Sequence, residues 1–219
     1  MIWEIKDPNK LHAERRRAEL TSFLLQPHPG DIVVDIGCGD GYQISHIAGS
    51  ESLIIGIDLS LLKLKNGKKR LKHVEFLRAC SDKLPFRRQI FDKVMCLELL
   101  EHVENPSKTL YEIDLVLKKG GILVISVPYR EEIAMTQCIY CNRLTPISGH
   151  LHSFDEDKVT SILPNNYVSL RHEYFGTILA SYILFSPLPL RIWRIIDRLC
   201  ALFPAVRPSW FLNKVQKMR

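Results

Sequence analysis

Residues 33–41, VVDIGCGDG, decide the fold of this chain. Their first half continues an apolar run from Ile32 that fits a strand covered on both faces. Their second half places glycines at alternate positions, which allows a tight turn and lets a ligand lie directly on the backbone. A dinucleotide-binding loop would have the spacing G-x-G-x-x-G, and here Tyr42 occupies its last position. The loop therefore favours an adenosine ligand without a pyrophosphate and disfavours an NAD-dependent oxidoreductase.

Strand-like and helix-like segments alternate on both sides of this loop. Apolar runs predict strands at 32–36, 53–57, 73–77, 91–97 and 122–127. Cap, proline and glycine signals predict helices at 10–25, around 44–47, after Ser60, and from Asn105-Pro106 through Leu117, with Gly120-Gly121 as the stop signal. Beyond Pro128 the pattern predicts a helix at 154–163 and strands at 167–175 and 209–218. We expect one α/β domain over residues 1–219, with a mostly parallel sheet, a C-terminal antiparallel hairpin and helices on both faces.

A carboxylate ends the second predicted strand. Asp58 lies in the segment IIGIDLS, and an acid at this place can accept hydrogen bonds from ribose hydroxyls. A surface aspartate at a strand end is the alternative interpretation. Its pairing with the glycine-rich loop favours the nucleoside site.

Four motifs in order resemble those of the class I S-adenosylmethionine (SAM)-dependent methyltransferases: VVDIGCGDG, IIGIDLS, ACSDKLPF and FDKVMCLELLEHVENP. The resemblance covers roughly Asp31 to Pro128. It is closest to the group that contains the ubiquinone/menaquinone-type and other small-molecule or lipid methyltransferases. It implies a Rossmann-like methyltransferase sheet with SAM as cofactor. The residues that it implies for cofactor binding are Asp35, Gly37, Cys38, Gly39, Gly41, Asp58, Leu59, Cys80, Ser81, Cys96 and Leu97.

One position departs from the family pattern. Where the family has an acid that accepts the adenine amine, this chain has Cys80, a weak acceptor. Either Asp82 substitutes for that acid or the hydrogen bond is absent.

Methyl transfer needs no fixed catalytic residue, because a sulfonium methyl is already electrophilic and orientation supplies much of the rate. A base would help a hydroxyl, amine or activated carbon acceptor. His102, in the segment LEHVENP, is the first candidate and Glu98 is the second. A packing or capping role is the alternative for His102.

Residues 129–153 form a predicted insertion, either a zinc knuckle or a lid. Cys138 and Cys141 make a C-x-x-C pair, and His150 and His152 follow it. Two thiolates and two imidazoles are a complete tetrahedral set for structural zinc. Some members of the resembled group carry a CxxCG-then-His insertion here, although Asn142 replaces the glycine in this chain. The alternative is a pair of reduced thiols and two surface or pocket histidines.

Residues 174–206 form a second predicted insertion, which is apolar and basic. From Arg171 onward the chain has eight Lys or Arg against Glu173 and Asp197, which accounts for its whole formal charge of +6. Prolines interrupt the uncharged stretch 174–190, so a membrane span is not predicted. A following helix would carry Arg191, Arg194 and Arg198 on one face and Ile192, Ile195, Ile196, Leu199 and Phe203 on another. Such a helix suits a membrane surface, a lid over the substrate pocket, or an oligomer contact.

The composition is that of a globular protein with reduced cysteines, and the first residues show no signal peptide. These features predict a cytoplasmic location, with peripheral contact at the membrane surface as an option. We expect a methyltransferase acting on a small-molecule or lipid-like acceptor. The alternatives are a SAM-binding protein with degenerate catalysis and a protein or nucleic-acid methyltransferase. Nucleic acid is disfavoured because the aromatic residues are not interleaved with the basic ones.

Overall fold

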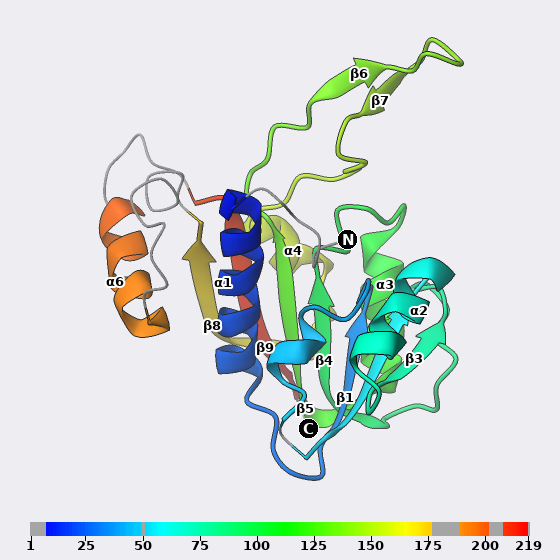
Figure 1. Cartoon of the computed structure of the whole chain (residues 1–219), viewed down its shortest axis with the longest axis vertical. Helices are drawn as coiled ribbons and strands as arrows, with labels where there is room; N and C mark the ends of the chain where they lie inside the picture. Colours follow the sequence, from blue (N-terminus) through cyan, green and yellow to red (C-terminus); the bar gives the residue numbers. More distant parts are fainter. Residues whose placement is uncertain (1–7, 50, 177–188, 202–207, 219) are drawn as a thin grey trace.

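The computed structural model describes residues 8–49, 51–176, 189–201 and 208–218. At its centre is a seven-stranded sheet of order β3-β2-β1-β4-β5-β9-β8 (Figure 1). The strands are β1 (Ile32–Ile36), β2 (Leu53–Asp58), β3 (Glu75–Arg78), β4 (Phe91–Leu97), β5 (Leu117–Pro128), β8 (Tyr167–Phe175) and β9 (Trp210–Lys217). Strands β1 to β5 run parallel, and β9 is antiparallel to both β5 and β8. The predicted parallel sheet with a C-terminal antiparallel hairpin is therefore confirmed.

Helices cover both faces of the sheet, as predicted. They are α1 (Pro8–Leu25), the 3-10 turn η2 (Ile44–His46), α2 (Leu61–Arg70), α3 (Pro106–Val116), α4 (Glu156–Ile162) and α6 (Leu190–Ala201). Alternate residues of β1 point to opposite faces: Val34 packs in a core with α3 and α4, and Val33 packs in a core with α1, η2, α2 and α6. In Figure 1, α1 accordingly lies in front of the sheet and α4 behind it.

The carboxyl ends of β1, β2 and β4 meet at one edge of the sheet. The register places Ile36 opposite both Ile57 and Cys96, the residues just before the ends of β2 and β4. Beyond β1 the backbone turns sharply, and the N–H groups of Gly37 and Cys38 both donate to the carbonyl of Ile57, at 2.8 and 2.9 Å. This edge therefore brings together the glycine-rich loop, Asp58 and the turn that follows β4.

Some helix boundaries differ from the predicted ones by one or two residues, for local reasons. The helix after Asn105 ends at Val116, one residue before the predicted Leu117, because Leu117 already pairs with Phe91 in the sheet. The later helix begins at Glu156, because the side chain of Asp155 accepts the N–H of Lys158 and caps it there.

Within the predicted insertion 129–153, strands β6 (Met135–Gln137) and β7 (Leu144–Pro146) form an antiparallel hairpin. The hairpin projects away from the rest of the molecule (Figure 1). Of the predicted insertion 174–206, the end of β8 and helix α6 are described. The remainder, with Phe203, lies outside the described residues.

Helix α6 packs through a face that the sequence pattern did not single out. Trp193, Asp197 and Cys200 are buried, whereas Arg194 and Arg198 both form ion pairs with Glu173 of β8. The apolar row points outward, with exposed fractions of 47%, 59% and 55% for Ile192, Ile195 and Leu199. Among the described residues, no helix combines the length and apolar character needed to cross a membrane.

Candidate active site

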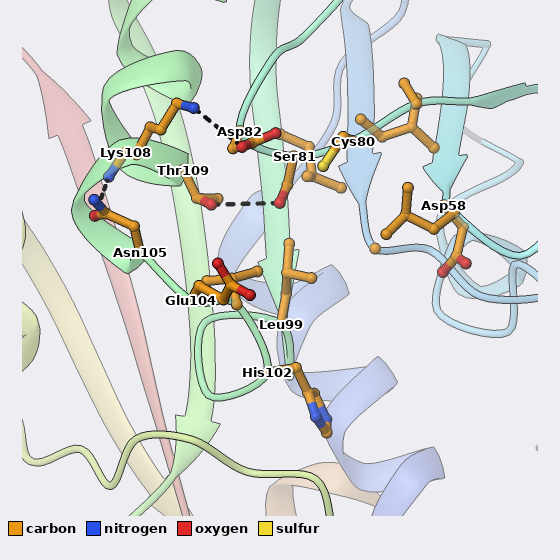
Figure 2. Close-up of a pocket in the computed structure, with 16 residues that line it drawn as sticks. Asp58, Cys80, Ser81, Asp82, Leu99, His102, Glu104, Asn105, Lys108 and Thr109 are labelled. Atoms are coloured by element: carbon orange, nitrogen blue, oxygen red, sulfur yellow. Dashed lines mark hydrogen bonds and ion pairs between the residues drawn. The ribbon is translucent and has the colours of Figure 1, made fainter.

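A pocket of about 610 Å³ opens at the carboxyl edge of β1, β2 and β4, a size typical of small-molecule sites. Figure 2 shows Asp58 on one side of the pocket and the α3 residues Asn105, Lys108 and Thr109 on the other. Five of the predicted cofactor residues line it, together with the predicted base: Gly37, Asp58, Leu59, Cys80, Ser81 and His102.

Asp58 is held rigidly at the edge of the pocket. Its Oδ2 accepts the N–H of Gly39 at 2.9 Å, and its Oδ1 accepts the N–H of Ser60 at 2.7 Å. Each carboxylate oxygen keeps a further lone pair, so the group can accept two more hydrogen bonds. A pair of adjacent hydroxyls, as on a ribose, is a fitting donor set.

Two glycines of the glycine-rich loop, Gly37 and Gly41, have no room for a side chain. Gly37 has φ +80°, and a Cβ there would lie 3.0 Å from Leu99 Cδ1. Gly41 has φ +79°, and a Cβ there would lie 2.9 Å from the ring of Phe76. Since Gly37 and Leu99 both line the pocket, the absent side chain lets a ligand reach the backbone between them.

Asp82 occupies the pocket wall beside Cys80, at the position expected for the adenine. Its carboxylate accepts a hydrogen bond from Lys108 Nζ at 3.1 Å (Figure 2). Hydrogen bonds from the Cys80 thiol and from Lys108 lower the pKa of Asp82 below its usual range. Asp82 is thus ionised and able to accept a further hydrogen bond, which supports its substitution for the acid that Cys80 replaces.

The remaining predicted cofactor residues lie behind the pocket wall. Asp35 is buried, and burial followed by the nearby charge of Asp58 raises its pKa to about 8. The side chain of Cys38 is also buried, and burial raises the pKa of its thiol. Cys96 and Leu97 point into the two hydrophobic cores on either side of the sheet. Their side chains contribute packing, and Leu99, two residues beyond β4, lines the pocket.

Glu98, the second candidate base, is surrounded by donors. Ser126 Oγ donates to its Oε1 at 2.6 Å, and Trp210 Nε1 donates to its Oε2 at 2.9 Å. Arg17 Nη2 lies 3.1 Å from the same Oε2. The Glu98 backbone has φ +49°, a strained conformation for a residue other than glycine. These contacts suit a group that fixes the turn after β4 and leave its carboxylate poorly placed to take up a proton.

Two further residues of that turn differ sharply in exposure. Glu101 is 1% exposed, and burial, followed by the charge of Glu98, raises its pKa to about 9. His102 is exposed, and its Nδ1 donates to the carbonyl of Gly149 at 3.2 Å, so its Nε2 is left as the basic nitrogen. Burial lowers the pKa of His102, which keeps the imidazole neutral near pH 7.

The four predicted zinc ligands are not gathered in the structure. Cys138 and Cys141 lie in the turn of the β6–β7 hairpin, where the backbone N–H of Cys141 lowers the pKa of the Cys138 thiol. His150 instead contacts Glu131 and the ring of His102, and His152 Nε2 donates to the carbonyl of Val103 at 2.9 Å. Among the described residues, the one group of three or more potential ligands within 4.8 Å of one another is Glu101, His102 and His150.

Sequence reasoning missed the pocket wall made by α3. Asn105, Lys108 and Thr109 line the pocket because the first turn of α3 starts at its rim. The signal was present in the cap itself: the Asn105 side chain accepts the N–H of Lys108 at 3.0 Å and fixes where the helix begins. The sequence does not reveal the side-chain packing that turns Thr109 toward Ser81. Their hydroxyl oxygens lie 3.3 Å apart.

Residues 34–125 match a protein family described as a methyltransferase domain. A demethylmenaquinone methyltransferase of Renibacterium salmoninarum is 35% identical over 98 residues, covering 45% of this chain and 41% of that protein. A ubiquinone/menaquinone biosynthesis C-methyltransferase of a Marinomonas species is 33% identical over 140 residues, covering 58% and 56%. A ubiquinone biosynthesis O-methyltransferase of Thiobacillus denitrificans is 32% identical over 133 residues, covering 57% of each. The chain spans about half the length of these relatives.

Solved structures share the fold over nearly the whole chain. A methyltransferase-like protein from Bacillus halodurans has a TM-score of 0.68 at 16% identity and covers 92% of this chain and 99% of that one. The [4+2]-cyclase SpnF has a TM-score of 0.68 at 18% identity and covers 95% and 82%. At these identities the likeness shows the fold alone.

Proposed function

We propose that this chain, which carries a methyltransferase domain of the class I SAM-dependent type, transfers the methyl group of SAM to a small-molecule or lipid-like acceptor. The observation that carries the proposal is the paired geometry of Asp58 and the glycine-rich loop. The carboxylate is fixed by the N–H groups of Gly39 and Ser60, at the rim of a pocket whose floor at Gly37 has no side chain.

In this proposal Asp58 accepts the ribose hydroxyls, and Asp82, beside Cys80 and Ser81, accepts the adenine amine. Gly37 to Gly41 lie along the methionine and ribose, and the buried Asp35 supports the loop from beneath. Bound SAM supplies a methyl group on a positively charged sulfur, which is reactive without further activation. The protein's contribution is then to hold the acceptor in line and to exclude water, and such orientation is worth roughly 7–11 kcal/mol.

The acceptor end of the pocket is the end at His102. Its Nδ1 is anchored on Gly149, so its Nε2 can take a proton from an acceptor hydroxyl, amine or acidic C–H. Glu98 acts as a positioning residue that holds this turn through Ser126 and Trp210. The zinc knuckle of Cys138, Cys141, His150 and His152 is not part of this proposal, because among the described residues neither cysteine joins the histidines in a cluster of potential ligands.

The similar proteins reported above are named as methyltransferases of demethylmenaquinone and of ubiquinone or menaquinone biosynthesis, which supports a quinone-like acceptor for this chain. The exposed apolar row of α6 fits such an acceptor. Around it, Arg171, Arg194 and Arg198 share the single carboxylate of Glu173, so this surface is basic. The proposal therefore includes contact between α6 and an anionic lipid surface, where the acceptor would be found.

Titration calorimetry with SAM tests the binding site. Asp58→Asn keeps the shape and removes the charge that accepts the hydroxyls, so SAM affinity should fall about tenfold to a hundredfold. Asp92→Asn is a matched control: Asp92 also accepts a backbone N–H, from Ile32, but at the opposite end of the sheet. Equal SAM affinity in both variants would sink the assignment of Asp58. Absence of SAM binding in the unaltered protein would sink the proposed function.

A further inference from the structure

The turn after β4 and the end of the insertion 129–153 are joined by a set of hydrogen bonds. The N–H of Leu151 donates to the carbonyl of Glu101 at 2.6 Å. His102 Nδ1 donates to the carbonyl of Gly149, and His152 Nε2 donates to the carbonyl of Val103. These bonds hold two segments that are nearly 50 residues apart in sequence in a fixed register.

The register places two imidazole rings against each other. The rings of His102 and His150 have centroids 4.6 Å apart and an interplanar angle of 75°. Each ring uses Nδ1 on an acceptor, His102 on the Gly149 carbonyl and His150 on the Glu131 carboxylate, which leaves both Nε2 atoms with a free lone pair. Metal-binding histidines are oriented in this way, with one nitrogen donating to a carbonyl or carboxylate and the other ligating the ion.

Next to the two rings lies a buried carboxylate that lacks a hydrogen-bond donor. Glu101 is 1% exposed, and among the described residues no other residue donates a hydrogen bond to either of its oxygens. A buried acceptor left unsatisfied costs about 1–3 kcal/mol, and more when it is charged. One potential ligand atom from each of Glu101, His102 and His150 lies within 4.8 Å of the others. A cation at their centre would supply what Glu101 lacks.

We propose that Glu101, His102 and His150 form a binding site for one divalent transition-metal ion, with Glu131 orienting His150. Two imidazoles and one carboxylate suit Zn²⁺, Fe²⁺ or Mn²⁺ better than Mg²⁺ or Ca²⁺, which prefer oxygen ligands. Three protein ligands leave coordination positions open, as in catalytic metal sites.

Because His102 also lines the pocket, an ion held by its ring would lie beside the acceptor end. The ion would bind an oxygen of the acceptor and draw charge from it, which favours acceptors with a hydroxyl or carbonyl oxygen. This role rests on the proposed function, whereas binding of the ion does not. His102 Nε2 has one lone pair and can either bind the ion or accept a proton. With the ion bound, polarisation of the acceptor oxygen would therefore take the place of proton removal by His102.

The test is binding of Zn²⁺ and Co²⁺ to the full chain after it has been stripped with a chelator. Calorimetry gives the stoichiometry and affinity, and the visible absorption of Co²⁺ reports imidazole and carboxylate ligation without any methyl transfer. We expect one ion per chain and about a hundredfold weaker binding in Glu101→Gln and in His150→Asn. The His150 side chain is 15% exposed, less deeply buried than Glu101, so this second variant remains informative if the Glu101 change impairs folding.

Two control variants distinguish the loss of a ligand from a loosened loop and from binding at the cysteines. His152→Asn loosens the same loop but removes no proposed ligand, so it should retain the ion. Cys138→Ser combined with Cys141→Ser should also retain it. No ion on the unaltered protein, loss of the ion in the cysteine variant, or retention in His150→Asn and Glu101→Gln would each overturn the proposal. SAM affinity measured on the same samples reports the proposed function separately.

Discussion

At Gly37 the glycine-rich loop packs against the turn after β4. The backbone of Gly37 is left-handed, and a side chain there would press on Leu99, which forms the pocket wall beside it. Gly30 provides a natural comparison, because it has φ +85° but no atom within 4 Å of a Cβ position. The two glycines share the backbone requirement and differ in the contact.

Alanine at Gly37 and at Gly30 should therefore separate the effect of backbone strain on stability from the effect of lost pocket space on SAM binding. Gly37→Ala and Gly30→Ala should each lower the free energy of unfolding by about 1–2 kcal/mol, the cost of a left-handed non-glycine residue. Only Gly37→Ala should weaken SAM binding, by about fivefold or more, because Leu99 must shift into the pocket. Urea unfolding and SAM calorimetry on both variants measure the two effects. Equal loss of SAM affinity in Gly30→Ala would contradict the contact.

Asp35 makes stability depend on pH. Burial and the charge of Asp58 raise its pKa from 3.8 in the unfolded chain to about 8 in the fold. Between these values the folded state holds a proton that the unfolded state has lost. The stabilising contribution is therefore complete below about pH 4 and falls as pH rises toward about 8, by at most about 1.4 kcal/mol per pH unit.

Asp35→Asn removes this titration and should flatten the decline in the free energy of unfolding over the same pH range. The comparison is made by urea unfolding at several pH values between about 5 and 8, with the difference between the two proteins as the readout. Parallel curves for the two proteins would show that Asp35 does not titrate there.

Helix α6 carries the prediction at the scale of an element. Its apolar row of Ile192, Ile195 and Leu199 is exposed, and its arginines surround Glu173. The full chain should co-sediment with vesicles of anionic phospholipid and less with vesicles of neutral phospholipid. Ile192→Ser combined with Ile195→Ser should weaken this binding about tenfold or more, since each buried isoleucine contributes roughly 1.5–3 kcal/mol.

Leu62→Ser is the control for that experiment, because Leu62 is 70% exposed on α2, a different helix. If Leu62→Ser weakens vesicle binding as much, or if the unaltered protein does not bind vesicles, α6 is not a lipid-contact surface. A lid over the pocket would then show as altered acceptor affinity, and an oligomer contact as a change of mass in solution.

Elements with a strong local signal could be predicted from the sequence. The strands at 32–36, 91–97 and 167–175 have the predicted bounds. The first two are apolar runs, and the third lies between the turn residues Pro164-Asn165-Asn166 and Gly176. The hairpin β6–β7 was not predicted, because its residues are mostly exposed and lack an alternating apolar pattern. The face of α6 that packs against the protein could not be predicted either. The sequence shows an arginine face and an isoleucine face, and only the position of Glu173 in β8 explains why the arginines turn toward the protein.

At the scale of the whole molecule, the order of motifs predicts the sheet, and the sheet places Asp58, the glycine-rich loop and the turn after β4 at one edge. That much follows from parallel strands, whose carboxyl ends share an edge. The partners of His150 and His152 do not follow from spacing along the chain. They depend on how the end of the insertion 129–153 returns to the turn at Glu101, which is a matter of tertiary packing.

The central claim is methyl transfer to a small, lipid-like acceptor, and labelled SAM tests it most directly. The protein is incubated with methyl-labelled SAM and an extract of cells that produce it, and the products are separated into lipid, macromolecular and aqueous small-molecule fractions. We predict label in the lipid or the aqueous small-molecule fraction, and loss of that label with Asp58→Asn. Label confined to protein or nucleic acid, or no label in any fraction from a protein that binds SAM, would contradict it.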